Sequence, residues 1–204
     1  ESNQSEHGGR YVTVRCSLTL VGESREGTTI HGGFLIKGDK ERDHVRLETM
    51  TVSHDEVDPA GGVGVHGVDG AKFDLKELSI KYCWSGVIAS GTQGTLTDCS
   101  VTNCGGSGIG VSVSRVMDDD LYVSSGVIHL RGERTKVMEN CTAHPDDLWQ
   151  PGQDYDGLNA ENSPKIILHA SLTNASVSLD NLWPGLIETE VYEFGSRYFH
   201  LRLH

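Results

Sequence analysis

The chain has 204 residues, 36% of them hydrophobic, which is enough for one domain with a continuous core. It carries 29 acidic and 17 basic residues, and this net charge of −12 argues against a nucleic-acid partner, whose binding depends on Lys and Arg. The same charge argues against docking on an anionic membrane. No apolar run approaches the roughly 18 residues of a transmembrane helix. We therefore expect a single domain over residues 1–204, without nucleic acid and without membrane insertion.

Residues 11–44 predict N-terminal strands that open the domain or cap its end. Apolar and polar residues alternate from Tyr11 to Leu20, which is typical of a strand. The segment from Thr28 to Lys37 predicts a strand pair around Gly32 and Gly33. A cap is expected because the last coil of a repeat protein otherwise exposes unpaired backbone groups.

Residues 45–175 repeat one short motif. The first clear copy has its apolar residues at Leu75, Leu78, Ile80, Val87 and Ala89. The second copy has them 21 to 22 residues later, at Leu96, Cys99, Val101, Ile109 and Val111. A unit that recurs at this distance indicates a solenoid, in which each coil buries its apolar side by stacking on its neighbours.

The same motif predicts further coils on both sides of these two copies. Upstream it fits Leu47, Met50 and Val52. Downstream it fits Met138, Cys141 and Ala143, and again Ile167, Ala170 and Leu172. Leu96 and Met138 lie 42 residues apart, twice the repeat, so a degenerate coil built from Leu121, Val123 and residues 126–129 is expected between them. One coil should then recur about every 21–29 residues.

Strands suit these coils better than short helices. No window holds an apolar stripe at i, i+3, i+4 and i+7 over three turns, and Gly, Ser, Thr and Val are abundant. Pairs such as Leu78 and Ile80 alternate with polar residues that would face outward. The sequence therefore predicts an all-β fold, a parallel β-solenoid of about five to seven coils.

The chain resembles the right-handed parallel β-helix proteins of the pectin-lyase-like superfamily. The resemblance rests on the segment from Leu18 to Phe34, on the repeated Ser-Gly-Val/Ile segments and on Asp98-Cys-Ser-Val-Thr-Asn-Cys104, and it covers roughly residues 10–175. It implies a right-handed β-helix. That superfamily holds lyases, hydrolases, epimerases, phage tailspikes and non-enzymatic surface proteins, so the resemblance implies the fold much more specifically than the activity.

The five cysteines leave the redox state open. Cys83 and Cys104 occupy one column of consecutive coils, close enough for a disulfide, but the pattern favours a reduced pair. Asn3, Asn140 and Asn174 begin glycosylation sequons. These sequons and the resemblance favour an extracellular or surface-associated protein.

Residues 176–204 predict a C-terminal cap or interface. Glu190–Phe194 and Arg197–Leu203 would form a β-hairpin on a two-residue turn at Gly195 and Ser196. Its aromatic residues could cover the last coil, form an oligomer contact or offer a stacking platform for sugars.

The densest polar cluster lies in residues 144–161. The catalytic candidates in it are His144, Asp146, Asp147, Tyr155 and Asp156, and the candidate ligand-binding residues are Trp149, Asp154 and Glu161. Paired carboxylates can act as acid and base in glycoside hydrolysis. No cofactor is certain, but Asp154 and Asp156 could hold Ca²⁺ through hard oxygen ligands. The alternative is an acidic, solvated loop.

Asp156-Gly-Leu-Asn159 resembles a segment of the polygalacturonases, although the other motifs of that family are absent. Arg131 and Arg134 precede the cluster by about one coil, and an arginine base there would suit pectate-lyase chemistry. Asp118, Asp119 and Asp120 are a weaker metal candidate, because alternate strand residues point in opposite directions.

Two further features lie on the outward side of the predicted strands. His66 is expected to face outward in the same column as Ser90 and Ser112. A flat polar face that could lie along a glycan is expected from Lys76, Ser79, Lys81, Thr97, Ser100 and Thr102.

These observations favour a non-catalytic glycan-binding or structural surface module, such as a coat, spike or adhesion unit. The alternative is a polysaccharide-modifying enzyme (lyase, epimerase or glycoside hydrolase) that acts on acidic glycans near residues 144–161. The expected partner is a polysaccharide or another glycan. An oligomer or larger assembly could form through the C-terminal segment or the solenoid ends.

Overall fold

The fold is known from a computed structural model. It describes residues 2–4, 10–38, 43–54, 62–116, 122–140, 158–160, 165–169, 171–179, 188–193 and 197–202. The predicted cluster and several corner segments lie outside these ranges. Within the described ranges the chain is almost entirely β-structure, with one short helix, α1 (Asn174–Val177).

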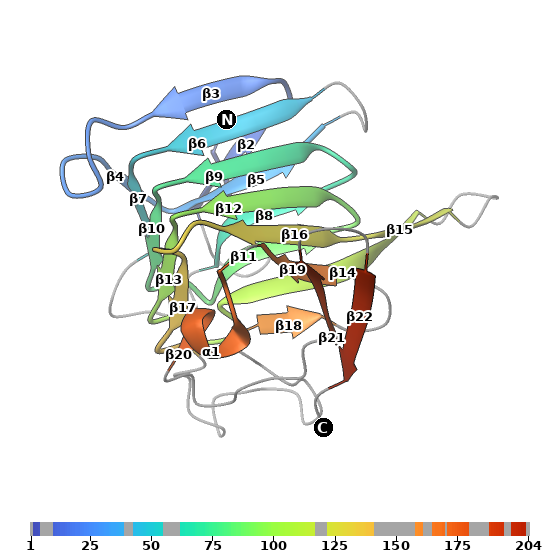
Figure 1. The fold of residues 1–204 in the computed structure, drawn as a ribbon. Coiled ribbons are helices and arrows are strands. Elements are labelled where there is room, and N and C mark those ends of the chain that lie inside the picture. The colour runs from blue at the N-terminus through green and yellow to red at the C-terminus, as the bar shows by residue number, and fades with distance from the viewer. Residues whose placement is uncertain are drawn as a thin grey trace.

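Three parallel sheets form the walls of a right-handed β-helix of six coils (Figure 1). Sheet A contains β2 (Arg10–Val14), β5 (Gly33–Lys37), β8 (Val63–Val68), β11 (Ser85–Ser90), β14 (Ile109–Val116) and β18 (Leu158–Ala160). Sheet B contains β3 (Leu18–Val21), β6 (His44–Glu48), β9 (Lys72–Lys76), β12 (Gln93–Thr97), β16 (Val127–Arg131) and β19 (Lys165–Leu168). Sheet C contains β4 (Thr29–His31), β7 (Thr51–Ser53), β10 (Ser79–Lys81), β13 (Ser100–Thr102), β17 (Lys136–Met138) and β20 (Ser178–Leu179).

The observed register confirms the repeat in the middle of the chain. Leu75 lies opposite Leu96, and Ile80 lies opposite Val101. The second half of the motif matches as well, because Val87 pairs with Ile109 in sheet A. Each coil therefore passes through sheets A, B and C in order. Its apolar residues continue columns that start in the coil before.

The predicted downstream coils are wrong in register. The residue opposite Leu96 is Leu130, 34 residues later, and Met138 instead lies opposite Thr102. Within the described residues, the degenerate coil that was predicted between Leu96 and Met138 is not formed. The chain leaves the helix after sheet A as an antiparallel hairpin of β14 and β15 (Tyr122–Ser125) and returns to sheet B at β16. In the last coil Leu168 occupies the column that was assigned to Ile167.

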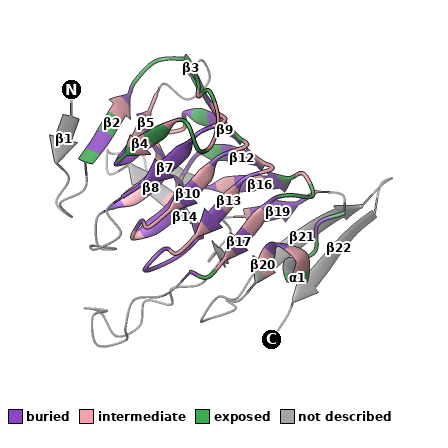
Figure 2. Ribbon diagram, turned by 90° about the vertical axis from the view of Figure 1, so that its left-hand side faces the viewer, coloured by how far each residue is buried: buried purple, intermediate pink, exposed green. Residues whose placement is uncertain are grey.

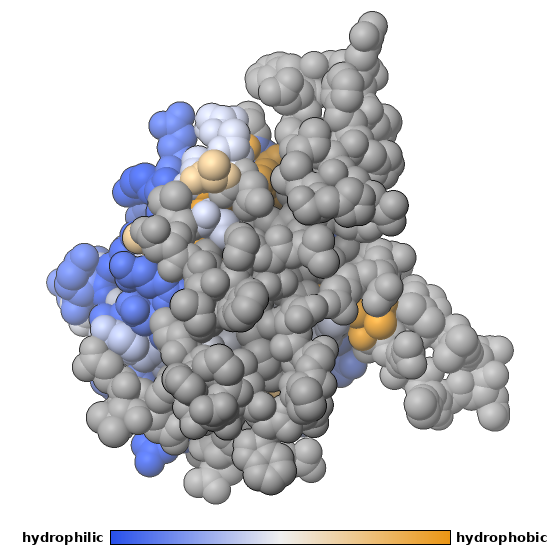
Figure 3. All heavy atoms as spheres, turned by 90° about the horizontal axis from the view of Figure 1, so that it is seen from below, coloured by the Kyte–Doolittle hydropathy of each residue, from blue (hydrophilic) through white to orange (hydrophobic). Residues whose placement is uncertain are grey.

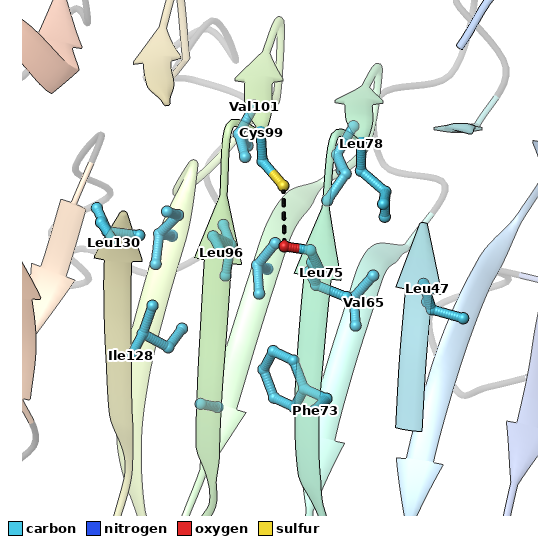
Figure 4. Close-up of a cluster of buried hydrophobic side chains, with 14 of the residues drawn as sticks. Leu47, Val65, Phe73, Leu75, Leu78, Leu96, Cys99, Val101, Ile128 and Leu130 are labelled. Carbon is cyan, nitrogen blue, oxygen red and sulfur yellow. Dashed lines mark hydrogen bonds between the residues drawn. The ribbon is translucent and has the colours of Figure 1, made fainter. Parts of the chain in front are cut away.

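The interior is a stack of aliphatic side chains (Figure 4). Leu47, Leu75, Leu96 and Leu130 follow one another on sheet B, and each is 0–1% exposed. A neighbouring column places the large ring of Phe73 opposite Gly94. A Cβ atom at Gly94 would lie 2.3 Å from that ring, so the glycine provides the space that the phenylalanine fills.

Left-handed residues turn the chain at two corners of each central coil. Thr49, Glu77 and Asp98 have φ of 54–55° at the corner between sheets B and C, where Gly132 takes the equivalent place with φ 78°. At the corner between sheets C and A the left-handed residues are Tyr82, Asn103 and Glu139. Positive φ is unfavourable for residues other than glycine, and for a β-branched residue such as Thr49 it is a true outlier.

The two ends of the helix are covered differently. At the N-terminal end, β1 (Ser2–Gln4) pairs antiparallel with β2 and extends sheet A. Sheet B ends there at β3, where Leu18 and Leu20 continue the core columns yet remain 37% and 36% exposed (Figure 2). Tyr11 to Leu20, predicted as one strand, is divided between β2 and β3.

At the C-terminal end the predicted hairpin is confirmed. β21 (Glu188–Glu193) pairs with β19 and, antiparallel, with β22 (Arg197–Arg202). Glu193 lies opposite Arg197, so three residues rather than the predicted two connect the strands. Within the described part of the chain, no helix is long and apolar enough to cross a membrane.

Shortening a side chain of the Leu47–Leu130 column tests this core. Leu96→Ala should lower the free energy of unfolding by about 2–5 kcal/mol, because it leaves a cavity between Leu75 and Leu130. The exposed Lys72→Ala, on the adjacent strand, should change it by less than about 0.5 kcal/mol. Urea denaturation of both variants measures this difference. Equal effects would contradict the assignment of Leu96 to the interior.

Relieving the left-handed strain at Thr49 tests the corners. Thr49→Asn should raise the free energy of unfolding by about 1 kcal/mol, because asparagine tolerates positive φ better than threonine. Thr95→Asn, inside β12, should lower it because asparagine is a poor strand residue. Thermal melts of the pair measure the sign of each change. A loss of stability in both variants would contradict the corner geometry.

Candidate functional site

All candidates from residues 144–161 lie outside the described residues: His144, Asp146, Asp147, Trp149, Asp154, Tyr155, Asp156 and Glu161. Their roles, including the Ca²⁺ site at Asp154 and Asp156, stay predictions. The ends of the segment are described. The chain ends β17 of sheet C at Met138 and begins β18 of sheet A at Leu158. Among the residues that are described, no group of three or more His, Cys, Asp or Glu side chains could hold a metal ion.

Asp118, Asp119 and Asp120 also lie outside the described residues, between β14 and β15. Arg131 and Arg134 are described and lie away from the sheet C to sheet A corner. Arg131 ends β16 on sheet B. Arg134 bridges coils at the corner between sheets B and C.

That bridge joins Arg134 to Glu77 at 3.0 Å and to Asp98 at 3.4 Å. From the first coil, Arg25 donates to the main-chain oxygen of Glu77 at 2.6 Å and to that of Asp98. Desolvation alone would raise the pKa of Asp98, but hydrogen bonds and charge from Arg134, with the charge of Arg25, lower it below its ordinary value. Arg25 and Arg134 therefore fasten the corner between sheets B and C, and Arg134 is engaged with Glu77 and Asp98.

The outward side of sheet B carries the richest array of polar groups, called here the sheet B face. Its members are His44, Arg46, Glu48, Lys72, Asp74, Lys76, Gln93, Thr95, Thr97, His129, Arg131, Lys165 and His169. These residues project outward because they alternate along the strands with the buried columns. They form rows across five successive coils.

The sheet B face is basic although the chain is acidic. From β6 to β19 it holds five Lys and Arg side chains and two carboxylates, those of Glu48 and Asp74, whereas β21, the next strand of the sheet, carries Glu188, Glu190 and Glu193. Of the 29 acidic residues of the chain, 13 lie in the described ranges, whereas 15 of the 17 basic residues do. Most of the basic residues therefore lie in the described part of the chain, whereas more than half of the acidic residues lie outside it.

The two carboxylates of this face are already paired. Asp74 contacts His44 Nε2 at 2.9 Å and Arg46 at 3.7 Å, and Glu48 contacts Arg46 at 3.6 Å. Such exposed pairs contribute little to stability. Among the described residues, no acidic side chain pairs with Lys72, Lys76 or Arg131. Those three charges therefore point to solvent on the same side of the solenoid.

His129 and His169 form a pair at the C-terminal part of the sheet B face. Their Nδ1 and Nε2 atoms lie 2.8 Å apart. One nitrogen must donate and the other accept, so at least one ring must be neutral. Burial lowers the pKa of both histidines, and the nearby charge of Arg131 lowers it further. The pair joins β16 to the residue after β19 and so fastens the last coil.

The predicted polar face does not lie in one plane. Lys76 and Thr97 are on sheet B, whereas Ser79, Lys81, Ser100 and Thr102 are on sheet C. The view from below shows hydrophilic residues along the edge that carries sheet C in Figure 1 (Figure 3). Sequence reasoning placed these residues outward correctly but missed the corner between them. It also missed Arg46, Lys72 and His129, which the alternation along β6, β9 and β16 would have identified.

The expectation for His66 is confirmed with one change. His66 lies opposite Ile88 in the register, not opposite Ser90. Its ring reaches Ser90 diagonally, with Nε2 3.1 Å from Oγ, and Ser90 Oγ lies 2.9 Å from Ser112 Oγ. The three side chains therefore form a hydrogen-bonded chain on the outward side of sheet A.

Buried cysteines and an asparagine complete the corner between sheets C and A. Cys83 and Cys104 are free thiols in the structure, and each donates to a main-chain oxygen. Asn140 is 1% exposed; its amide oxygen accepts from Cys104 N and its nitrogen donates to Val101 O. A side chain held in this way cannot carry a glycan in the folded protein. The sequon at Asn140 therefore gives no support to secretion.

Lowering the pH should weaken the contact between His129 and His169. Both have lowered pKa values, so the unfolded chain binds protons more readily and stability falls as the pH drops below about 6.5. His169→Gln should reduce this loss between pH 7 and pH 5, measured by urea midpoints, whereas His31→Gln on exposed β4 should not. An unchanged pH dependence in His169→Gln would contradict the role of the pair.

Comparison of the chain with protein-family models, with curated proteins and with solved structures finds no match. The β-helix is shown by the sheets themselves. The resemblance to the pectin-lyase-like superfamily remains a prediction from the sequence.

Proposed function

We propose that this chain is a glycan-binding surface module that does not cleave the glycan it binds, and that the sheet B face binds an acidic polysaccharide. The observation that carries the proposal is the basic character of this face on an acidic protein. Arg46, Lys72, Lys76, Arg131 and Lys165 come from four different coils and project from one sheet. A linear polyanion can contact several of them at once.

The spacing of the coils supports an extended ligand. Neighbouring strands of a sheet lie about 4.8 Å apart, which is similar to the length of one sugar residue in an extended chain. Gln93, Thr95 and Thr97 lie between the basic coils and can exchange hydrogen bonds with sugar hydroxyl groups. Because the strands already fix the backbone of these residues, ligand binding has to order their side chains but not their main chain.

The chemistry of this face suits binding better than catalysis. Glycoside hydrolysis needs two carboxyl groups that are free to act as acid and base or nucleophile. On the sheet B face both Asp74 and Glu48 are engaged with His44 and Arg46. The enzyme alternative rests on residues 144–161, outside the described residues. An extracellular or surface location is part of the proposal, since an acidic polysaccharide would be met there.

Charge reversal on the sheet B face tests the proposal. The double variant Lys76→Glu/Arg131→Glu should weaken binding of a uronic-acid polysaccharide at least tenfold in calorimetry, because two attractive contacts become repulsive. The variant Lys81→Glu, which makes one charge reversal of the same kind on sheet C, should bind like the wild type. Binding should also fall as salt is raised, and a neutral glucan of equal length should not bind.

Two results would count against this function. Unchanged affinity in the double variant would move the binding surface away from sheet B. Release of unsaturated products or new reducing ends from the same polysaccharide panel, with or without Ca²⁺, would favour the enzyme alternative. Neither result would affect the β-helix itself.

A further inference from the structure

The outward side of sheet A differs from that of sheet B, because its hydrogen-bonded chain lies among apolar groups. His66, Ser90 and Ser112 come from three consecutive coils. In the register His66 lies between Leu35 and Ile88, and all three are only partly exposed. In an ordinary row of polar side chains across a sheet, each residue pairs with its direct neighbour on the next strand, but the direct neighbours of His66 are apolar. Here the ring instead crosses to Ser90, two positions further along the next strand.

From this geometry we propose that His66 and Ser90 form a nucleophilic site that cleaves carboxylic esters with a short acyl group. The distance of 3.1 Å from His66 Nε2 to Ser90 Oγ is within the reach that a base needs to accept the serine proton. Ser112 is a positioning residue. If its hydroxyl donates to Ser90 Oγ, then Ser90 directs its own proton to His66.

The surroundings of His66 favour the neutral form of its ring. Burial lowers the pKa of His66, the charge of Lys37 lowers it further, and Asp69 opposes them in part. A neutral imidazole is the form that can accept a proton from serine.

A space for the acyl group lies beside the serines. Gly110 is opposite Ile88 and two residues before Ser112. Among the side chains that the structure describes, a Cβ atom built at Gly110 meets only Ile88 Cγ1, at an ordinary contact distance of 3.8 Å. Ser112 is exposed and Ser90 partly exposed, so a substrate can reach both from solvent. The size of one missing side chain favours a short acyl group over a long one.

The reaction follows the balanced course of a serine hydrolase. Ser90 Oγ adds to the carbonyl carbon while its proton passes to His66 Nε2. The carbon–alkoxy bond then breaks, and His66 returns the proton to the leaving alcohol. A water molecule next gives a proton to His66 and adds its oxygen to the acyl carbon, and Ser90 leaves as the hydroxyl. Ester and water thereby become acid and alcohol, without any other reactant.

The test uses the full chain with a fluorophosphonate probe and p-nitrophenyl acetate. Mass spectrometry should locate the probe on the peptide that contains Ser90. Ser90→Ala should abolish labelling, and His66→Gln should slow acetate release about 10²–10⁴-fold.

Ser100→Ala, an outward serine on sheet C, should react like the wild type. Gly110→Leu should block reaction, because its side chain would fill the space beside Ser112. The rate should rise with pH through a midpoint below the ordinary histidine value of about 6.5.

A wild-type protein that carries no label and releases no acetate above buffer would overturn the proposal. Labelling that maps to another residue would do so too, even if Ser90→Ala failed to fold. The variant Lys76→Glu/Arg131→Glu should keep full esterase activity, because its charges lie on sheet B. If this variant loses glycan binding but keeps esterase activity, the esterase site is distinct from the glycan-binding surface. Loss of esterase activity with glycan binding retained, in Ser90→Ala or His66→Gln, would show the same.

Discussion

The structure depends on the exact parallel register between consecutive coils. Leu47, Leu75, Leu96 and Leu130 reach the same interior column only because each coil enters sheet B at an equivalent residue. Left-handed residues at the corners maintain this, since they turn the chain at the same point after each strand. A shift by one residue would exchange the inward and outward sides of a strand. Core and surface functions are therefore fixed by a single geometric constraint.

Local pattern was sufficient to predict the central coils but not their full connectivity. Leu75 and Leu96 are separated by one uninterrupted coil, so their spacing shows in the sequence. The place of Leu130 in the column was missed because the β14–β15 hairpin adds residues without adding a coil. Met138 lies at twice the repeat length from Leu96 only by coincidence. The corners were missed for another reason. Glu77 and Asp98 adopt a backbone conformation that is usually associated with glycine.

The candidate sites were harder to predict than the fold because they depend on contacts between coils. The alternation along β8 shows that His66 faces outward, but only the register reveals that it reaches Ser90 diagonally. The pairing of His129 with His169 crosses 40 residues in the same way. Composition also hid the sheet B face, because an overall charge of −12 conceals a local excess of Lys and Arg. Residues 144–161 remain predicted on their chemistry alone.

The exposed first strand of sheet B has a consequence for how the molecule opens. Leu18 and Leu20 have a neighbouring coil on one side only, whereas Leu75 has one on each side. In a linear array the end unit loses one interface when it detaches, and an interior unit loses two. Fraying therefore begins at β3, and its amide hydrogens exchange with solvent at a lower energetic cost than those of β9 and β12. Resistance to unfolding is graded along the axis rather than uniform.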